Sequence, residues 1–387
     1  MRKQDLARVV FRALRAVLYP TRGGRRRPLP GSIRRLLVVN RLRIGDSVVT
    51  TPFLAHVRAH LPGAEITLLV QPPIEELFLN DPRVDVLVAK PLRGPLAVVR
   101  GKWAPGFDAA VILDPTPKSG WIARRARSRW VAGYDSHGRG IFLDAALPAP
   151  SYWNRPLSEY RDHNPTKLLH QTEAWMRLAE SLGLPPAEPQ PYLALSDADR
   201  SWARERLTAV PGDGPPVVLH PGSDASYLWP VDRWAALAEG LAAQGGGRLF
   251  LTGGPGDKEL AAGIQAASKA PILSLAGGTS LGRMAALIAE ARILVSVDTC
   301  ATHMASAVGT PCVALFGAGD PDIWRPYGEG HVVLRTQADL DCLGCKQARC
   351  ALVAAGGRHE CMEGIPVDRV LASALELLAR PRPVPVP

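Results

Sequence analysis

Short apolar runs that alternate with helical segments constrain the fold of this chain more than any other feature. A first series has runs at 36–40, 65–70, 84–89 and 107–113, and a second has runs within 215–223, 248–254, 271–277, 291–298 and 311–317. Strands that alternate with helices in this way form βαβ units around a parallel sheet. Because 387 residues exceed what one ordinary core supports, the two series predict two doubly wound α/β domains.

Polar, Pro-rich segments separate the two series. We expect an N-terminal domain over 31–195 and a C-terminal domain over 196–387, with the linker "PPAEPQPYLALSDADRSW" at the junction. In open parallel sheets, ligands bind beyond the carboxyl ends of the strands. We therefore predict an interdomain cleft that is lined by the loops following the strands.

Most of the formal charge of +10 lies in residues 1–30, which contain nine Lys or Arg and one Asp. The nearly neutral remainder argues against a nucleic-acid surface. Apolar residues share one helical face of this arm and arginines the other, which is typical of a helix on an anionic membrane surface. Two alternatives are a helix packed on the domain and, less favoured, an RNA-binding tail.

The chain has no run of about 18 apolar residues, so we expect no transmembrane helix. Its basic start lacks the apolar stretch and the cleavage site of a secretory signal. These features predict a cytoplasmic protein.

Asp46 follows the first predicted strand in "NRLRIGDSVVTTP". One interpretation is that it caps the next helix, because Asp is favoured at that position. The other is that its carboxylate faces the cleft and takes a proton from a substrate hydroxyl.

The second domain carries polar groups after three of its strands. In "HPGSDASYLWPVDRW", Gly222 and Ser223 can offer backbone N–H groups and a hydroxyl to phosphate oxygens. "LTGGPGDKE" is another glycine-rich turn, and "SVDTCATHMASAVG" opens a small-residue helix. That helix start can bind a diphosphate or its sugar, or it is simply a capped helix with a hydrogen-bonded His303. Neither turn fits GxGxxG, which disfavours a nicotinamide dehydrogenase.

Four cysteines cluster near the end of the chain, at Cys342, Cys345, Cys350 and Cys361. A CxxC pair with two further cysteines is a reasonable tetrahedral pattern for zinc or iron, and His359 is a possible substitute ligand. The alternative is a loop with reduced thiols. Cys300 and Cys312 lie apart and are typical of small buried residues.

Taken together and in order, these blocks resemble glycosyltransferase family 9, the ADP-heptose:lipopolysaccharide heptosyltransferases, from about Leu36 to the end of the chain. The resemblance implies a GT-B fold of two Rossmann-like domains, with the acceptor in the first and the nucleotide-sugar in the second. It also implies inversion at the anomeric carbon and no catalytic metal.

The resemblance assigns roles to individual residues. Asp46 matches the proposed general base. The matched donor-binding residues are Gly222, Ser223, Asp257, Thr279, Asp298, Thr299, Cys300 and His303. The cysteine cluster is similar to one in many family members, including a branch that heptosylates autotransporter proteins, and we expect a structural role for it.

The chain departs from the family pattern in three places. Tyr227 stands where a phosphate-contacting Lys is usual, and Lys258 or Arg233 is a candidate to compensate. Cys300 replaces a glycine, and the basic arm lies outside the family core.

The sequence therefore predicts an inverting, metal-independent transfer of heptose from ADP-heptose to a lipid A–core acceptor in lipopolysaccharide. We expect no catalytic cofactor, no nucleic-acid partner and peripheral binding to the cytoplasmic face of the inner membrane. The alternatives are another donor, a protein acceptor such as an autotransporter, and a paralogue that binds the donor without turnover.

Overall fold

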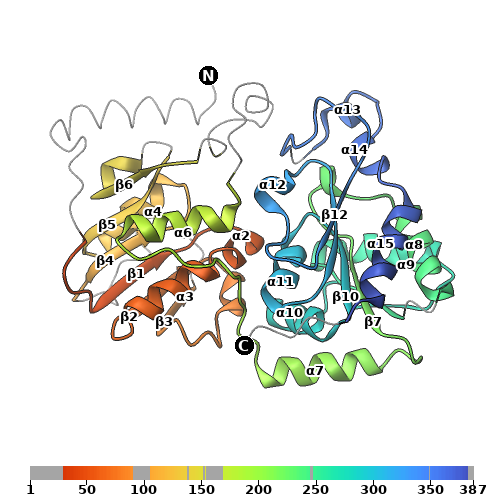
Figure 1. Ribbon diagram of the computed structural model, residues 1–387, viewed down its shortest axis with the longest axis horizontal. Coiled ribbons are helices and arrows are strands. Elements are labelled where there is room, and N and C mark those ends of the chain that lie inside the picture. The colour runs from red at the N-terminus through yellow and green to blue at the C-terminus, as the bar shows by residue number, and fades with distance from the viewer. Residues whose placement is uncertain are drawn as a thin grey trace. The chain divides into compact units, whose positions relative to one another are not determined.

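The computed structural model describes residues 29–89, 105–136, 139–150, 153, 169–244, 247–347 and 349–381. The chain divides into two compact units (Figure 1). Unit 1 is Met1–Arg155 with Thr172–Pro189, and unit 2 is Pro156–Gln171 with Gln190–Pro387. Each unit contains one six-stranded, fully parallel sheet, so the predicted fold of two α/β domains is confirmed. The cleft expected between them stays a prediction.

The unit 1 sheet has the strand order β3-β2-β1-β4-β5-β6, which is the order of a Rossmann fold. Its strands are β1 (Arg35–Val39), β2 (Glu65–Val70), β3 (Val86–Ala89), β4 (Phe107–Ile112), β5 (Ser128–Asp135) and β6 (Ala145–Pro148). Its helices are α2 (Ile44–Val48), α3 (Thr51–His60), η1 (Ile74–Leu77), α4 (Pro117–Arg125), η2 (Arg139–Phe142) and α6 (Gln171–Ser181).

Unit 2 repeats this topology with the order β12-β11-β10-β7-β8-β9. Its strands are β7 (Pro216–His220), β8 (Arg248–Leu251), β9 (Ile272–Ser274), β10 (Ile293–Val297), β11 (Cys312–Phe316) and β12 (Val332–Arg335). Its helices are α7 (Asp197–Thr208), η4 (Ala225–Tyr227), α8 (Val231–Ala243), η5 (Pro255–Asp257), α9 (Lys258–Ala267), α10 (Leu281–Glu290), α11 (Cys300–Val308), α12 (Pro321–Trp324), α13 (Ala351–Ala354), α14 (Glu360–Glu363) and α15 (Val367–Ala379).

Three strands escaped the sequence analysis, namely β5, β6 and β12. β5 reads SRWVAGYD, and its Arg and Gly interrupt the apolar run. β6 reads AALP and begins a Pro-rich segment, and β12 reads VVLR, an apolar run of three residues. These elements are defined by pairing across the sheet rather than by local periodicity.

In each unit, apolar side chains of the sheet pack with those of the helices in a buried core. In unit 2, β7, β10 and β11 pack against Trp229 and Trp234, whose rings meet edge to face at 5.2 Å. The indole N–H of Trp229 donates to Ile365 O at 3.1 Å, which holds the segment before α15 onto the core. In unit 1, α6 packs against β5, where the Tyr134 hydroxyl donates to Ala174 O.

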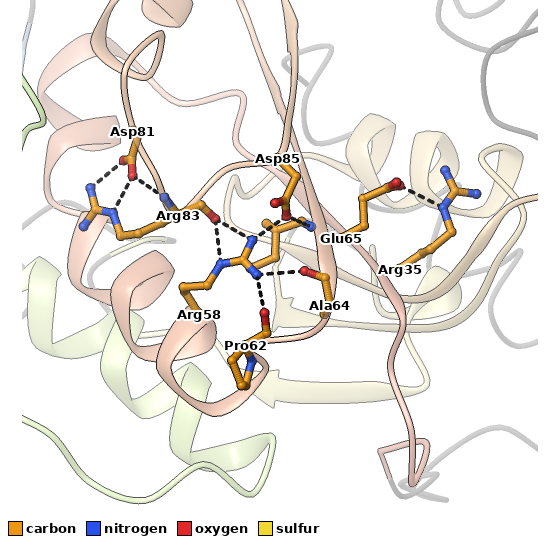
Figure 2. Close-up of polar contacts among 9 residues, drawn as sticks. Arg35, Arg58, Pro62, Ala64, Glu65, Asp81, Arg83 and Asp85 are labelled. Carbon is orange, nitrogen blue, oxygen red and sulfur yellow. Dashed lines mark hydrogen bonds and ion pairs between the residues drawn. The ribbon is translucent and has the colours of Figure 1, made fainter. Parts of the chain in front are cut away.

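Ion pairs and backbone contacts tie together the amino ends of β1, β2 and β3 (Figure 2). Arg35 Nε meets Glu65 Oε1 at 2.9 Å, and Arg58 pairs with Asp85. Arg58 also donates to Ala64 O at 2.8 Å and to Pro62 O at 3.3 Å. These contacts fix α3 to the start of the strands, at the edge opposite the candidate site.

The predicted membrane-associating arm, residues 1–30, lies outside the described residues except for Leu29 and Pro30. Among the helices that the structure describes, none has the length and apolar character needed to cross a membrane.

Candidate functional site

The carboxyl edge of the unit 2 sheet brings most of the predicted donor-binding residues together. Gly222 and Ser223 follow β7, and Asp298 follows β10, its direct neighbour in the sheet. The Ser223 hydroxyl donates to Asp298 O at 3.2 Å, and the Ser296 hydroxyl donates to His220 O at 3.2 Å. Residues that are 75 apart in sequence therefore share one edge, as parallel pairing of β7 and β10 requires.

Asp257 locks two of the glycine-rich turns to each other. Its Oδ2 accepts the backbone N–H of Gly254 at 2.7 Å. A Cβ on Gly222 would lie 2.3 Å from the same oxygen, so only glycine fits there. Asp257 thus fixes the positions of the loops after β7 and β8 by its contacts with Gly222 and Gly254.

Asp298 makes a similar close approach on the other side of β10. A Cβ on Gly319, which follows β11, would lie 1.7 Å from Asp298 Oδ2. The loops after β7, β10 and β11 therefore contact one another directly, through Ser223 with Asp298 and through Gly319 with Asp298. Glycine at this edge allows close approach of backbone to a ligand.

Helix α11 begins at this edge with Cys300, directly after the extended residue Thr299. The Thr299 side chain makes no capping hydrogen bond to the helix. A nine-residue helix directs partial positive charge from its first N–H groups toward whatever lies there. This position favours an anionic group.

His303 is the polar side chain of this edge that stands out most. It is 5 % exposed, and within the described part of the chain its Nδ1 has no hydrogen-bond partner. Burial, with a smaller contribution from His170, lowers its pKa to about 3. The imidazole is therefore neutral, and it can donate or accept one further hydrogen bond. A buried orphan polar atom of this kind is typical of a ligand site.

The Cys300 thiol is not activated. Burial raises its pKa to about 11, so it is a thiol rather than a thiolate at neutral pH. Thr299 Oγ1 lies 3.9 Å from its sulfur. Cys300 is thus a half-buried thiol at the start of α11, whereas Cys312 is buried as expected.

Thr279 lies one residue before Ser280, which caps α10 through a bond to the Arg283 N–H. The loop that contains it is joined to the β8 loop by a bond from Gly277 N to Gly253 O at 2.9 Å. Thr279 is therefore at the β9 side of the edge, away from Asp298.

Of the two candidates to compensate for Tyr227, Arg233 is engaged with the segment before α15 rather than with the donor edge. Its Nη1 donates to Ile365 O at 2.7 Å, beside the buried Trp229. Lys258 begins α9, and its Cε lies so close to Gly277 that a Cβ there would approach it to 2.4 Å. It lies on the β8–β9 side of the sheet.

Asp46 belongs to the carboxyl edge of unit 1. The residue that caps α2 is Arg43, and Asp46 is the third residue of the helix. The capping interpretation of Asp46 is therefore wrong. The side chain is half-buried, and a carboxylate in the first turn of a helix is stabilised by the helix dipole.

Asn40 holds α2 in place, and the sequence analysis missed it. It is fully buried directly after β1, where its Nδ2 donates to Thr50 Oγ1 at 3.1 Å. Its Oδ1 accepts from the Ser47 hydroxyl at 3.3 Å. A polar residue straight after an apolar run was the available signal.

A cluster of charges formed by the half-buried Arg41 and the buried Asp114 and Arg139 also escaped the sequence analysis. Arg139 is 0 % exposed, and its Nε donates to Tyr134 O. Burial lowers its pKa to about 10, while Asp114 and Asp135 oppose that shift. Asp114 Oδ2 and both Nη atoms of Arg139 have no hydrogen-bond partner among the described residues. The cluster is charged, largely buried and incompletely satisfied.

The four clustered cysteines are close enough to affect one another. Burial raises the pKa of Cys361 to about 12, with smaller contributions from Cys342, Cys345 and Cys350. However, within the described ranges no three His, Cys, Asp or Glu side chains form a group that could hold a metal. His359 Nε2 instead lies 2.9 Å from Ser226 O. The residue types suit zinc or iron, but this arrangement does not, so the structural metal stays a prediction.

The comparisons with known proteins agree with this architecture. A model of glycosyltransferase family 9 (heptosyltransferase) matches residues 103–354. The chain is 29 % identical to lipopolysaccharide heptosyltransferase 1 of Pseudomonas aeruginosa over 344 residues, covering 82 % of this chain and 87 % of the relative.

Two solved structures share the fold. The family 9 glycosyltransferase of Veillonella parvula superposes with a TM-score of 0.74 at 20 % identity, covering 89 % of this chain and 97 % of that one. ADP-heptose lps heptosyltransferase II of E. coli has a TM-score of 0.72 at 22 % identity, covering 89 % and 98 %.

Proposed function

The chain belongs to glycosyltransferase family 9, the heptosyltransferase family, and from this premise we propose that it transfers heptose from ADP-heptose to an inner-core acceptor of lipopolysaccharide. The names of its relatives support this donor and this acceptor, since they are lipopolysaccharide heptosyltransferases. The chain is a glycosyltransferase, and the specific sugar and acceptor are the proposal.

The observation that carries the proposal is the carboxyl edge of unit 2. There the start of α11, the Ser223 hydroxyl and the buried neutral His303 lie on adjoining elements. Helix N–H groups suit a diphosphate, and the unpartnered Nδ1 of His303 suits a phosphate oxygen or a sugar hydroxyl. A nucleotide-sugar offers both kinds of group.

Asp46 is the general base of the proposed reaction. It accepts the proton of the acceptor hydroxyl while that oxygen bonds to the anomeric carbon. The bond from the same carbon to the diphosphate breaks, and ADP departs with the electron pair. A single displacement of this kind inverts the anomeric centre. Helix N–H groups in unit 2 stabilise the departing charge, so the reaction needs no catalytic metal.

We place the enzyme at the cytoplasmic surface of a membrane, where a lipid-linked acceptor is available. The support is the sequence of residues 1–30, which is basic and amphipathic. Flotation of the full chain and of a chain starting at Pro30 with phosphatidylglycerol vesicles tests this. Equal flotation of both would refute the role of the arm.

Calorimetric titration of the full chain with ADP-heptose, beside UDP-glucose and GDP-mannose, tests the donor. Selective binding of ADP-heptose is the expected result, and preference for another sugar nucleotide would overturn the donor assignment. Incubation with ADP-heptose and either lipid A–core or an autotransporter fragment, followed by mass spectrometry, then identifies the acceptor. Binding without any transfer would favour a non-catalytic paralogue.

The metal prediction has its own test. Elemental analysis of the purified chain is expected to find about one zinc or iron, because a CxxC pair with two further cysteines is a sequence pattern typical of a tetrahedral site. The Cys345→Ser variant should lose that metal, and Cys312→Ser, which changes a buried thiol of β11, should keep it. A metal-free wild-type chain would show that the thiols are simply reduced.

A further inference from the structure

We propose that Lys346, on the cysteine-bearing segment, binds the diphosphate of the nucleotide-sugar. The inference rests on the proposed function and names a donor-binding residue that the sequence analysis did not select. Three features of unit 2 support it: where the Lys346 backbone is held, what charge surrounds it, and what conformation it adopts.

The segment 344–347 is hydrogen-bonded on two sides. Gly344 N donates to Gly317 O at 3.2 Å and Lys346 N donates to Ala318 O at 2.9 Å, so the segment lies against the end of β11. On its other side, Gln347 O accepts the Ser226 hydroxyl of η4. Lys346 is therefore held between the loop after β11 and the loop after β7.

Those two loops belong to the donor edge. Ala318 precedes Gly319, which lies directly against Asp298. Asp298 O in turn accepts the Ser223 hydroxyl, three residues before Ser226. Lys346 is thus attached to the same interlocked loops that carry the proposed diphosphate site.

The charge of the edge makes a cation necessary. The loops that follow β7, β8, β10 and β11 contain Asp224, Asp257, Asp298 and Asp320, and the cations beside them in the sequence are Lys258 and Arg325. A diphosphate approaching these carboxylates is repelled unless cations offset them. Lys258 lies by Gly277 on the β9 side, and Arg233 is bonded to Ile365 O. On the Asp298 side, Arg325 follows Trp324, whose ring contacts His303. Lys346 is a second basic residue there.

The backbone conformation of Lys346 is unusual. Its φ is +55°, and Arg127 is the other non-glycine residue with positive φ in the described part of the chain. Left-handed backbone is unfavourable for a residue with a Cβ, and glycine adopts it at no such cost. A strained residue held by specific hydrogen bonds is typical of a functional site. The side chain is half-buried, and its flexible stem carries a compact charge.

This placement gives the cysteine-bearing segment a role. Lys346 follows Cys345 directly and precedes Cys350, and His359 binds Ser226 O from the far end of the same segment. The segment thereby positions a cation at the donor edge.

Calorimetric titration with ADP tests the inference on wild type, Lys346→Gln, Lys346→Arg and Lys346→Gly. Loss of one charge-assisted contact should weaken ADP binding by about 10- to 100-fold in Lys346→Gln. Lys346→Arg should stay within a few-fold of wild type. Lys346→Gly should bind ADP as weakly as Lys346→Gln while melting no lower than wild type, because glycine relieves the strain. Lys269→Ala, an exposed lysine of unit 2, is the matched control and should not change affinity.

The two possible failures are distinct. If wild type binds ADP and Lys346→Gln binds it equally well, the inference is overturned and the proposed function stands. If wild type binds neither ADP nor ADP-heptose, the proposed function fails, and the inference fails with it.

Discussion

The two edges of the unit 1 sheet contain the same residue types in very different environments. At the amino edge, Arg35 pairs with Glu65 and Arg58 with Asp85, as Figure 2 shows. At the carboxyl edge of the same sheet, Asp114 Oδ2 and both Nη atoms of Arg139 have no hydrogen-bond partner among the residues described. Residue types do not distinguish the two edges, whereas the pairing of their charged side chains does.

The paired charges at the amino edge contribute to stability, whereas the unsatisfied charges at the carboxyl edge indicate a binding site. A buried charge that is fully paired fixes the packing of its elements. A buried polar group without a hydrogen-bond partner costs free energy. Such a group is typical of a site where a bound ligand supplies the missing hydrogen bond. In unit 2, likewise, His303 Nδ1 at the carboxyl edge of the sheet has no hydrogen-bond partner among the described residues. The carboxyl edges of both sheets are therefore candidate binding surfaces. The amino edge of unit 1 stabilises the fold.

The largest expected effect is at Asp46. Asp46→Ala and Asp46→Asn should lower the rate of heptose transfer by about 10²- to 10⁴-fold, because the general base is lost. ADP-heptose binding, measured by calorimetry, should stay close to wild type. Glu65→Ala removes a carboxylate from the opposite edge of the same sheet and should leave transfer unchanged. Normal turnover in Asp46→Ala would show that the base is elsewhere.

The amino edge should give the reverse result. Asp81→Ala should lower the free energy of unfolding by about 3–5 kcal/mol, because Arg83 is 8 % exposed and would lose the carboxylate that accepts its Nε and Nη2 hydrogen bonds. Denaturant titration measures this loss, and transfer per folded molecule should be unchanged. Glu65→Ala breaks an exposed pair and should cost about 1 kcal/mol or less. Equal losses in the two variants would contradict the importance of burial.

Acid should weaken unit 2, whose described residues include the buried His170, His220 and His303 and the half-buried His331. Burial lowers the pKa of His303 to about 3 and those of His170, His220 and His331 to about 4, below the ordinary value of 6.5. The unfolded chain therefore binds more protons below pH 6.5, and stability falls as the pH drops from 6.5 toward 4. Each histidine should contribute on the order of 1–2 kcal/mol between pH 7 and 5.

Urea titrations at pH 7 and pH 5 measure this loss. His303→Gln should reduce the dependence of stability on pH, and His60→Gln, an exposed histidine of α3, should not. Equal stability of the wild type at the two pH values would contradict the assignment of neutral, buried histidines.

The smallest expected effect is at Ser223. Ser223→Ala removes a hydroxyl of the proposed donor site, and a hydrogen bond from such a group to the donor contributes about 0.5–1.5 kcal/mol. Donor affinity should fall by a few-fold in calorimetry, with little change in melting temperature. Thr208→Ala removes an exposed hydroxyl at the end of α7 and is the control. Unchanged affinity in Ser223→Ala would remove that hydroxyl from the donor site.

The local pattern of the sequence determined most of the framework. Apolar runs placed nine of the strands, and parallel pairing then placed the residues after them at common edges. Gly222, Ser223, Asp298 and His303 were identifiable in this way, because a polar group that follows a buried strand has few other reasons to be there.

The tertiary structure alone decided which side chains have partners. It showed that Arg233 binds Ile365 O, that Asp46 is not a helix cap, and that Asp114 and Arg139 meet after different strands. It also brought Lys346 to Ala318, although 28 residues separate them. Periodicity reports only which face of an element is buried. Long-range hydrogen bonds and charge pairs depend on which loops the sheet brings together, and no local pattern contains that information.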